Sequence, residues 1–252
     1  VWRDQHAGRH IADVFGARST QELRLCEWLA LGEGRGASDL LRPLWSDPDG
    51  GLDATLAKLV ARGLITCDPS AIKDSFDLRM RLRGHDAIVR SSMAAEDVTR
   101  RSRQLAEAIE SSGVIPEQTR AEILARAFAR AAMWDKSADH CLRAATFAIK
   151  AEERDCAMRY IVLAQDSARQ IEDVTQRTHW MGQVRMVEGD LQKAAGQFDV
   201  ARRTYCELLT LCRITGDQRL LAETLHDLGD LYYITRRYHK GIRAEHQSLK
   251  IW

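Results

Sequence analysis

The sequence predicts a mainly α-helical protein in two parts: three short helices with a small β-hairpin, followed by a long array of paired helices. Three observations predict this fold class. Apolar residues recur with a helical period over most of the chain. Residues 76–83 instead alternate strictly between apolar and polar residues, as in a half-buried strand. Finally, the C-terminal part repeats a pattern with an offset of about 40 residues.

Three helices are predicted before the hairpin. The glycine-rich stretch 32–36 ends the first helix and is predicted to be a loop. Ser38 is a favourable N-cap for the second helix, and Gly63 provides the C-terminal stop of the third. The predicted ranges are residues 21–31, 39–45 and 52–62.

Two β-prone segments follow, residues 64–67 and residues 76–83, with turn-forming residues such as Pro69 and Asp74 between them. Three helices and a β-hairpin are the elements of a winged-helix domain, which is therefore predicted over residues 20–93. Residues 1–19 are predicted to be a linker or the end of a preceding domain. Residues 94–133 are predicted to form a helical linker.

Helix pairs are predicted over residues 134–252. Gly189 and Gly229 stand in the same register, as do Phe198 and Tyr238, at an offset of about 40 residues. The last unit, with Leu225, Leu228, Gly229 and Tyr232, resembles the tetratricopeptide pattern. The sequence thus predicts an α-solenoid of tetratricopeptide-like helix pairs. The array ends without a polar capping helix, so we expect it to be truncated at its C-terminus and capable of self-association.

The junction between these parts carries the most informative motif, Gly84-His85-Asp86. Together with the preceding helices and hairpin, it resembles the end of the winged-helix domain of STAND (NB-ARC) regulatory ATPases, in which a Met-His-Asp motif closes the nucleotide site. The resemblance covers roughly residues 20–95. Gly84 stands where the family has methionine, so an apolar anchor is lost and the backbone gains freedom.

The resemblance implies a role for His85. In the family this histidine contacts the β-phosphate of bound ADP and holds the closed, inactive state. An imidazole can donate to an anion and is easily moved when a domain rotates. The implied protein would contain an upstream nucleotide-binding domain in cis, which binds ADP or ATP with Mg²⁺. The chain itself has no Gly-x-x-x-x-Gly-Lys-Ser/Thr loop, so no cofactor is expected in it.

A solenoid exposes a groove lined by the first helix of each pair. The polar residues and one tyrosine on the predicted first helices are therefore candidates for contact with a protein or a small-molecule ligand. The aromatic residues of the repeats are predicted by their period to lie mostly in the core, including Trp134, Trp180, Phe198, Tyr205, Tyr232, Tyr233 and Tyr238. The candidate partner-binding residues are His179, Gln183, Arg185, Gln192, Glu223, His226, Asp230 and Tyr233.

The composition and the motif spacing argue against several classes of protein and of site. A net charge of +1 gives no general attraction to nucleic acid or anionic membranes, and no apolar run is long enough to span a bilayer. Six cysteines without a Cys-x-x-Cys pair indicate buried hydrophobes in a reducing compartment, so a cytoplasmic protein is expected. His6 and His10 have a metal-compatible spacing without a third ligand, so no metal site is expected. No catalytic constellation is recognisable, and an enzyme is not expected.

Two other functions remain open. The first is a tetratricopeptide-repeat interaction scaffold without nucleotide control. The second is a winged-helix DNA-binding regulator, whose third helix would enter the major groove. That helix carries only Lys58 and Arg62 as basic residues, and nucleic acid is not an expected partner.

Overall fold

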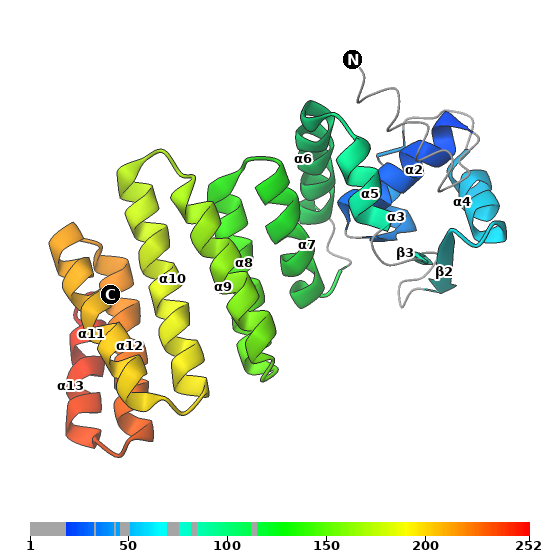
Figure 1. The fold of residues 1–252 in the computed structure, drawn as a ribbon. Helices are drawn as coiled ribbons and strands as arrows, with labels where there is room; N and C mark the ends of the chain where they lie inside the picture. Colours follow the sequence, from blue (N-terminus) through cyan, green and yellow to red (C-terminus); the bar gives the residue numbers. More distant parts are fainter. Residues whose placement is uncertain are drawn as a thin grey trace. The chain divides into compact units, whose positions relative to one another are not determined.

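The computed structural model describes residues 19–32, 34–42, 44–45, 51–69, 76–81, 85–111 and 115–252 (Figure 1). The chain divides into two compact units, Val1–Met133 and Trp134–Trp252, and each is considered by itself. Both units consist mainly of helices, so the predicted fold class is confirmed. All but the last residue of the predicted N-terminal segment 1–19 lies outside the described residues.

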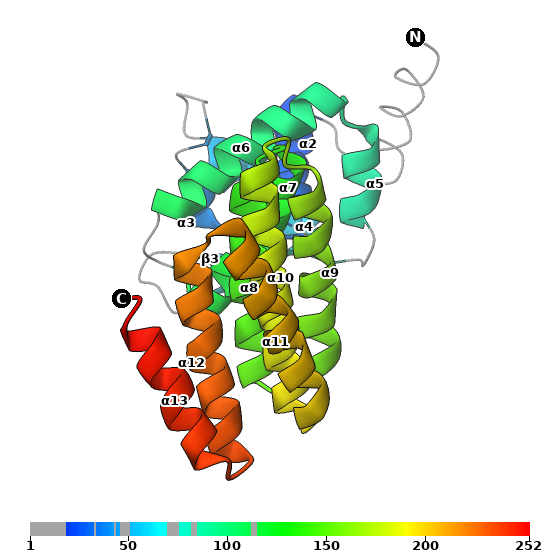
Figure 2. The ribbon, with the colours of Figure 1, turned by 90° about the vertical axis from the view of Figure 1, so that its left-hand side faces the viewer.

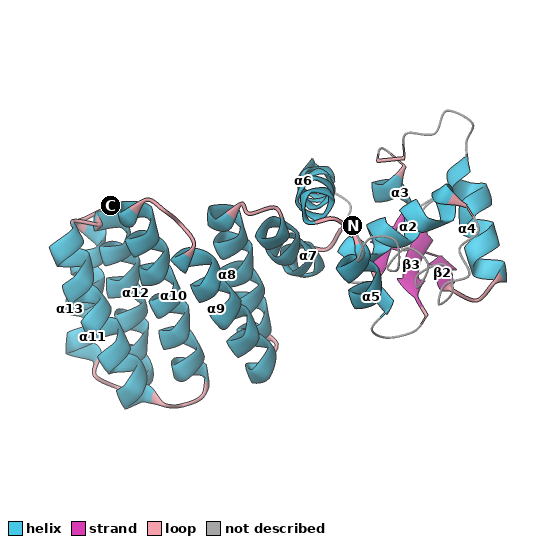
Figure 3. Ribbon diagram, turned by 45° about the horizontal axis from the view of Figure 1, so that its top comes forward, coloured by secondary structure: helices cyan, strands magenta, loops and turns pink. Residues whose placement is uncertain are grey.

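The first unit begins in the order helix, strand, helix, helix, strand, strand. Its three strands form one antiparallel sheet in the order β1-β3-β2, with β3 in the middle (Figure 3, magenta). The hairpin predicted from the sequence is formed by β2 and β3. The elements are α2 (Thr20–Leu31), β1 (Arg35–Ala37), α3 (Ser38–Leu41), α4 (Gly51–Ala61), β2 (Ile65–Pro69) and β3 (Phe76–Met80).

Local sequence signals explain where these helices begin and end and which side chains of β3 are buried. The Ser19 hydroxyl caps α2 by accepting a hydrogen bond from the Glu22 backbone N–H at 3.2 Å. Gly63, after α4, has a φ of +68°, a conformation in which glycine is favoured. In β3, Leu78 is fully buried and Arg79 is exposed, which follows the predicted alternation.

Two predictions in this region were wrong in detail. The stretch 32–36, predicted as a loop, contributes to strand β1, because residues 35–37 pair with β3 far along the chain. Helix α3 ends at Leu41 rather than at residue 45, and the following Pro43 in the sequence disfavours helical backbone at Arg42.

Three further helices are described in the first unit: α5 (His85–Ser92), α6 (Ala95–Ser111) and α7 (Glu117–Arg130). Leu105 and Ile109 of α6 and Leu124 and Phe128 of α7 belong to the same buried cluster as the core of α2. The Arg130 guanidinium also donates to the Leu31 carbonyl at 2.8 Å. The segment predicted as a linker is therefore helical, and it shares the core of the first unit.

The second unit contains three antiparallel helix pairs, α8 with α9, α10 with α11, and α12 with α13 (Figures 1 and 2). The turn within each pair contains one residue with positive φ, namely Glu152, Gly196 and Arg236. The bounds are α8 (Trp134–Lys150), α9 (Arg154–Arg169), α10 (Val174–Ala194), α11 (Phe198–Thr215), α12 (Gln218–Ile234) and α13 (Tyr238–Leu249).

Small residues allow close contact within the pairs, as the repeat predicts. A Cβ atom on Gly189 would lie only 2.5 Å from the Tyr205 ring, so the ring packs directly on the α10 backbone. Tyr205 is fully buried, as predicted. The core prediction was wrong for Phe198, which is 36% exposed. It was also wrong for Tyr233 and Tyr238, which are 45% and 51% exposed and pack edge-to-face on each other.

Two expectations from composition concern the whole chain. The six cysteines are free, and burial raises the pKa of the Cys26 thiol to about 12, as for an inert core residue. In the described part of the chain, no helix combines the length and the apolar character that crossing a bilayer requires.

Candidate functional site

His85 is the first residue of α5, and Gly84 lies outside the described residues, as does the side chain of His85. Asp86 lies in the first turn of α5 and pairs with Arg90 at 2.8 Å. Arg90 also donates to the Ala30 carbonyl at 2.5 Å. These contacts fix α5 to the end of α2, so the backbone at residue 85 is held against α2.

The eight predicted partner-binding residues separate into three groups. Four lie on α10 and four on α12, the first helices of the second and third pairs, as the repeat predicts. Their side chains differ in which neighbouring helix they meet. His179, Gln183 and Glu223 lie between α10 and α12, Arg185 and Gln192 meet α11, and His226, Asp230 and Tyr233 lie beside α13.

The first group belongs to a row of polar contacts joining α10 and α12. The His179 Nδ1 and a carboxylate oxygen of Asp217 are 2.6 Å apart, and the Gln183 amide donates to Glu223 at 3.2 Å. Burial alone would raise the pKa of Asp217, but the hydrogen bond with His179 is the main reason that it falls below its usual value.

Farther along the same two helices lies a cluster that sequence reasoning missed. Lys193 Nζ is 3.1 Å from Asp190 and 3.7 Å from Asp227, and it sits 5.8 Å from the centre of the Tyr205 ring. The Tyr205 hydroxyl donates to Asp190 at 2.7 Å. Burial raises the pKa of the Asp227 carboxyl to about 7, and the negative charge of Asp190 adds to the rise.

We call these contacts the α10–α12 polar stripe. Its members are half-buried, and they place four carboxylates against one lysine and one imidazole. Arg219 pairs with one of these carboxylates, Glu223, at 3.0 Å. Within the stripe, the other three carboxylates face only one lysine and one imidazole, so the stripe is electronegative. The stripe consists of His179, Gln183, Asp190, Lys193, Asp217, Glu223 and Asp227.

At the N-terminal end of α10, the stripe borders a pocket of about 540 Å³. Its walls combine apolar side chains with the His179–Asp217 pair, the mixture found in many ligand pockets. Trp180, Leu211 and Leu220 contribute the apolar part. A partner bound along the stripe could therefore place an apolar group beside a hydrogen-bonding pair.

Arg185 and Gln192 are directed to another surface. Arg185 is exposed and pairs with Glu188 at 2.8 Å and with Glu207 of α11 at 3.8 Å. The Gln192 amide oxygen accepts a hydrogen bond from Thr204, also on α11, at 2.8 Å. These two residues therefore do not join the α10–α12 polar stripe.

The predicted DNA-reading helix is α4. Arg62, which directly follows α4, pairs with Glu22 of α2 at 2.7 Å, and Asp53 of α4 pairs with Arg42 at 3.3 Å. One of the two basic side chains of the predicted helix thus has an intramolecular partner, and an acidic residue lies in the first turn of α4. This arrangement provides little positive charge for phosphate contacts.

Comparisons with known proteins give one structural likeness. No family model matches the chain, and no curated protein matches it significantly. Among solved structures, the chain is similar to a Signal Transduction ATPase with Numerous Domains (STAND) protein with a tetratricopeptide repeat sensor from Pyrococcus horikoshii. The TM-score is 0.37 and the identity 13%, over 96% of this chain and 45% of that one. This chain therefore spans less than half the length of that protein.

Proposed function

We propose that this chain is the regulatory and sensing part of a STAND-type signal-transduction ATPase, and that its repeats bind a partner along the α10–α12 polar stripe. The observation that carries the sensing role is the stripe itself. It joins the first helices of two successive pairs, the surface with which solenoids bind ligands. Three residues predicted from the sequence, His179, Gln183 and Glu223, lie on it.

The negative charge of the stripe favours a positively charged partner. Lys193 is shared between Asp190 and Asp227, so neither carboxylate has a cation of its own within the stripe. A guanidinium or ammonium group from a partner would supply the missing positive charge in a half-buried setting, where such pairs are stronger than at an open surface. We therefore expect a protein partner that presents a basic segment.

The relay to the nucleotide would run through the winged-helix unit. Because α5 is fixed to α2 through Arg90, a rotation of this unit would carry residue 85 with it. In the proposed parent protein, His85 would contact the β-phosphate of ADP in an upstream domain and leave it when a partner binds. ATP with Mg²⁺ would then replace ADP, and this chain would itself perform no chemistry.

Peptide binding tests the sensing role. A fluorescent peptide rich in arginine and lysine should bind the chain, whereas a glutamate-rich peptide of equal length should not. Asp227→Asn should weaken binding of the basic peptide about tenfold, or about 1.4 kcal/mol, in fluorescence anisotropy at physiological salt. Asp199→Asn is the matched control, since Asp199 is exposed on α11 and lies off the stripe. Equal binding of both peptides, or an equal effect of both substitutions, would contradict the proposal.

Nucleotide content distinguishes the switch from a plain interaction scaffold. A longer chain that includes the proposed upstream domain should purify with ADP, released by denaturation and identified by chromatography. His85→Ala should reduce the bound ADP strongly, whereas His246→Ala, an exposed histidine of α13, should not. A folded protein without nucleotide would leave the scaffold as the better account of the repeats.

A further inference from the structure

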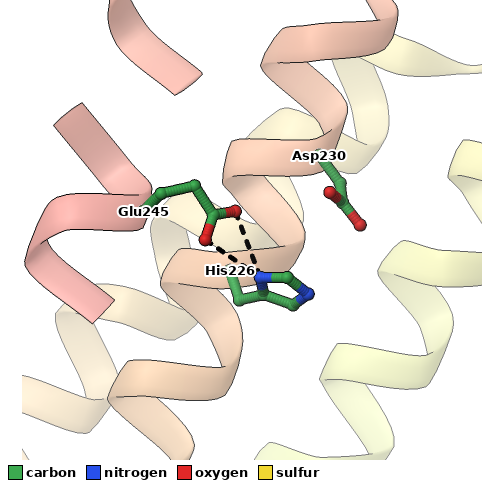
Figure 4. Close-up of side chains that lie close together, drawn as sticks. All are labelled: His226, Asp230 and Glu245. Atoms are coloured by element: carbon green, nitrogen blue, oxygen red, sulfur yellow. Dashed lines mark hydrogen bonds and ion pairs between the residues drawn. The ribbon is translucent and has the colours of Figure 1, made fainter. Parts of the chain in front are cut away.

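Three metal-ligand side chains converge between α12 and α13, outside the α10–α12 polar stripe. His226 and Asp230 lie one turn apart on α12, and Glu245 reaches them from α13 (Figure 4). One potential ligand atom from each lies within 4.8 Å of the other two. The His226 Nδ1 is already 3.1 Å from the Glu245 carboxylate.

The preceding repeat shows which residues occupy the corresponding positions between α10 and α11. At an offset of 40 residues, read from the pairs Gly189/Gly229 and Phe198/Tyr238, Asp190 corresponds to Asp230. By the same offset Met186 corresponds to His226, and Tyr205 corresponds to Glu245. In the earlier repeat, the tyrosine fills the space between the helices, and its hydroxyl donates to the aspartate at 2.7 Å.

The later repeat thus replaces a thioether and a phenol with an imidazole and a carboxylate, and it retains the aspartate. Gly229 on α12 leaves room for the carboxylate that this replacement introduces. A Cβ on Gly229 would lie 2.5 Å from a carboxylate oxygen of Glu245, so the glycine provides the space in which that carboxylate lies against α12. Glu245 is consequently only half exposed, although His226 and Asp230 are exposed.

An ion pair between His226 and Glu245 accounts for two of the three side chains. It does not account for Asp230, which places a second carboxylate within 4.8 Å of the first. Two carboxylates this close repel each other, and a cation bound between them relieves the repulsion. A divalent ion compensates both charges, and an imidazole in the set favours a transition metal over Mg²⁺ or Ca²⁺.

We propose that His226, Asp230 and Glu245 bind a divalent transition-metal ion, of which Zn²⁺ is the representative. Ligand atoms around one zinc ion lie at about 2.0–2.2 Å from it, hence about 3.4 Å from one another in a tetrahedron. The His226–Glu245 separation already fits, and the exposed Asp230 can turn toward them at little cost. Water would complete the coordination. The ion would join α12 to α13, and the site is independent of the proposed sensing role.

Calorimetric titration of the metal-free 252-residue chain with Zn²⁺, in the presence of a phosphine reductant, tests the site. We expect one strong site per chain. His226→Asn and Glu245→Gln should each weaken this binding at least about tenfold. Zn²⁺ should also raise the melting temperature of the native sequence, because it binds only the folded pair of helices, and this rise should vanish in Glu245→Gln.

Two control variants separate this site from adventitious binding. His239→Asn removes another exposed histidine of α13, and Cys206→Ser removes the exposed thiol. Both variants should bind Zn²⁺ like the native chain. The proposal is wrong if no stoichiometric binding occurs, or if either control weakens binding as much as Glu245→Gln does. Circular dichroism of each variant shows that it is folded, so a loss of binding cannot be mistaken for unfolding.

Discussion

Replacing Tyr205 by alanine is expected to lower the free energy of unfolding of the repeat unit by about 3–5 kcal/mol. The ring is fully buried in the cluster between α10, α11 and α12, and it lies directly on the backbone at Gly189. Alanine would remove this apolar contact and leave a cavity, because the helices on either side are held by their other contacts. The hydroxyl bond to Asp190 would be lost as well. Urea denaturation followed by circular dichroism measures the change.

Two variants show which part of the side chain matters. Tyr205→Phe keeps the ring and removes only the hydrogen bond to Asp190, whose carboxylate still pairs with Lys193, so a loss of about 1 kcal/mol is expected. Ile214→Ala truncates a side chain that is 78% exposed and should change stability by less than about 0.5 kcal/mol. If Tyr205→Ala lowered the free energy of unfolding as little as Ile214→Ala does, the Tyr205 ring would not pack between α10 and α11 as it does in this structure.

The architecture of the repeats followed from local signals in the sequence. The offset between Gly189 and Gly229 predicted where helices approach closely, and both glycines do lie against a side chain of the next helix. The same period could not predict how far each aromatic residue is covered. Phe198 and Tyr238 stand in the same register, and both are exposed, at 36% and 51%. Each is the first residue of the second helix of its pair, and the period alone does not tell how far neighbouring helices cover that position.

In the first unit, strand β1 could not be predicted from the sequence. Strand β1 has three residues, one of them Gly36, and neither period nor composition indicates a strand there. It forms because residues 35–37 meet β3, more than forty positions later, and this pairing satisfies their backbone groups. The β2–β3 hairpin was predictable because its alternation and turn residues lie within one short segment.

The candidate sites were predictable only in part. The sequence placed the candidates on the first helices of the pairs, which gave His179, Gln183 and Glu223 of the stripe and His226 and Asp230 of the metal-ligand group. It missed Asp190, Lys193, Asp217, Asp227 and Glu245, because their significance depends on contacts across helices. One signal was present: Asp190 and Asp230 stand at the repeat offset and could have been compared.

Replacing Phe128 by alanine is expected to destabilise the first unit by about 3–5 kcal/mol. Phe128 lies on α7, within the segment that the sequence predicted to be a linker, but its ring is fully buried in the core that includes Leu25 and Leu29 of α2. Removing the ring opens a cavity between α7 and α2. Thermal or urea unfolding, followed with probes in each unit, measures the effect.

Which of the two unfolding transitions each substitution lowers shows to which unit α6 and α7 belong. If α6 and α7 belong to the first unit, Phe128→Ala should lower its unfolding transition and leave the repeat transition unchanged, whereas Tyr205→Ala should do the opposite. Val174→Ala, on a side chain 63% exposed, serves as the surface control. A linker that only bridges the units would lose little on truncation of Phe128, and a result below about 1 kcal/mol would exclude the shared core. A large loss would mean that α5, α6 and α7 respond together with α2, as the proposed relay through residue 85 requires.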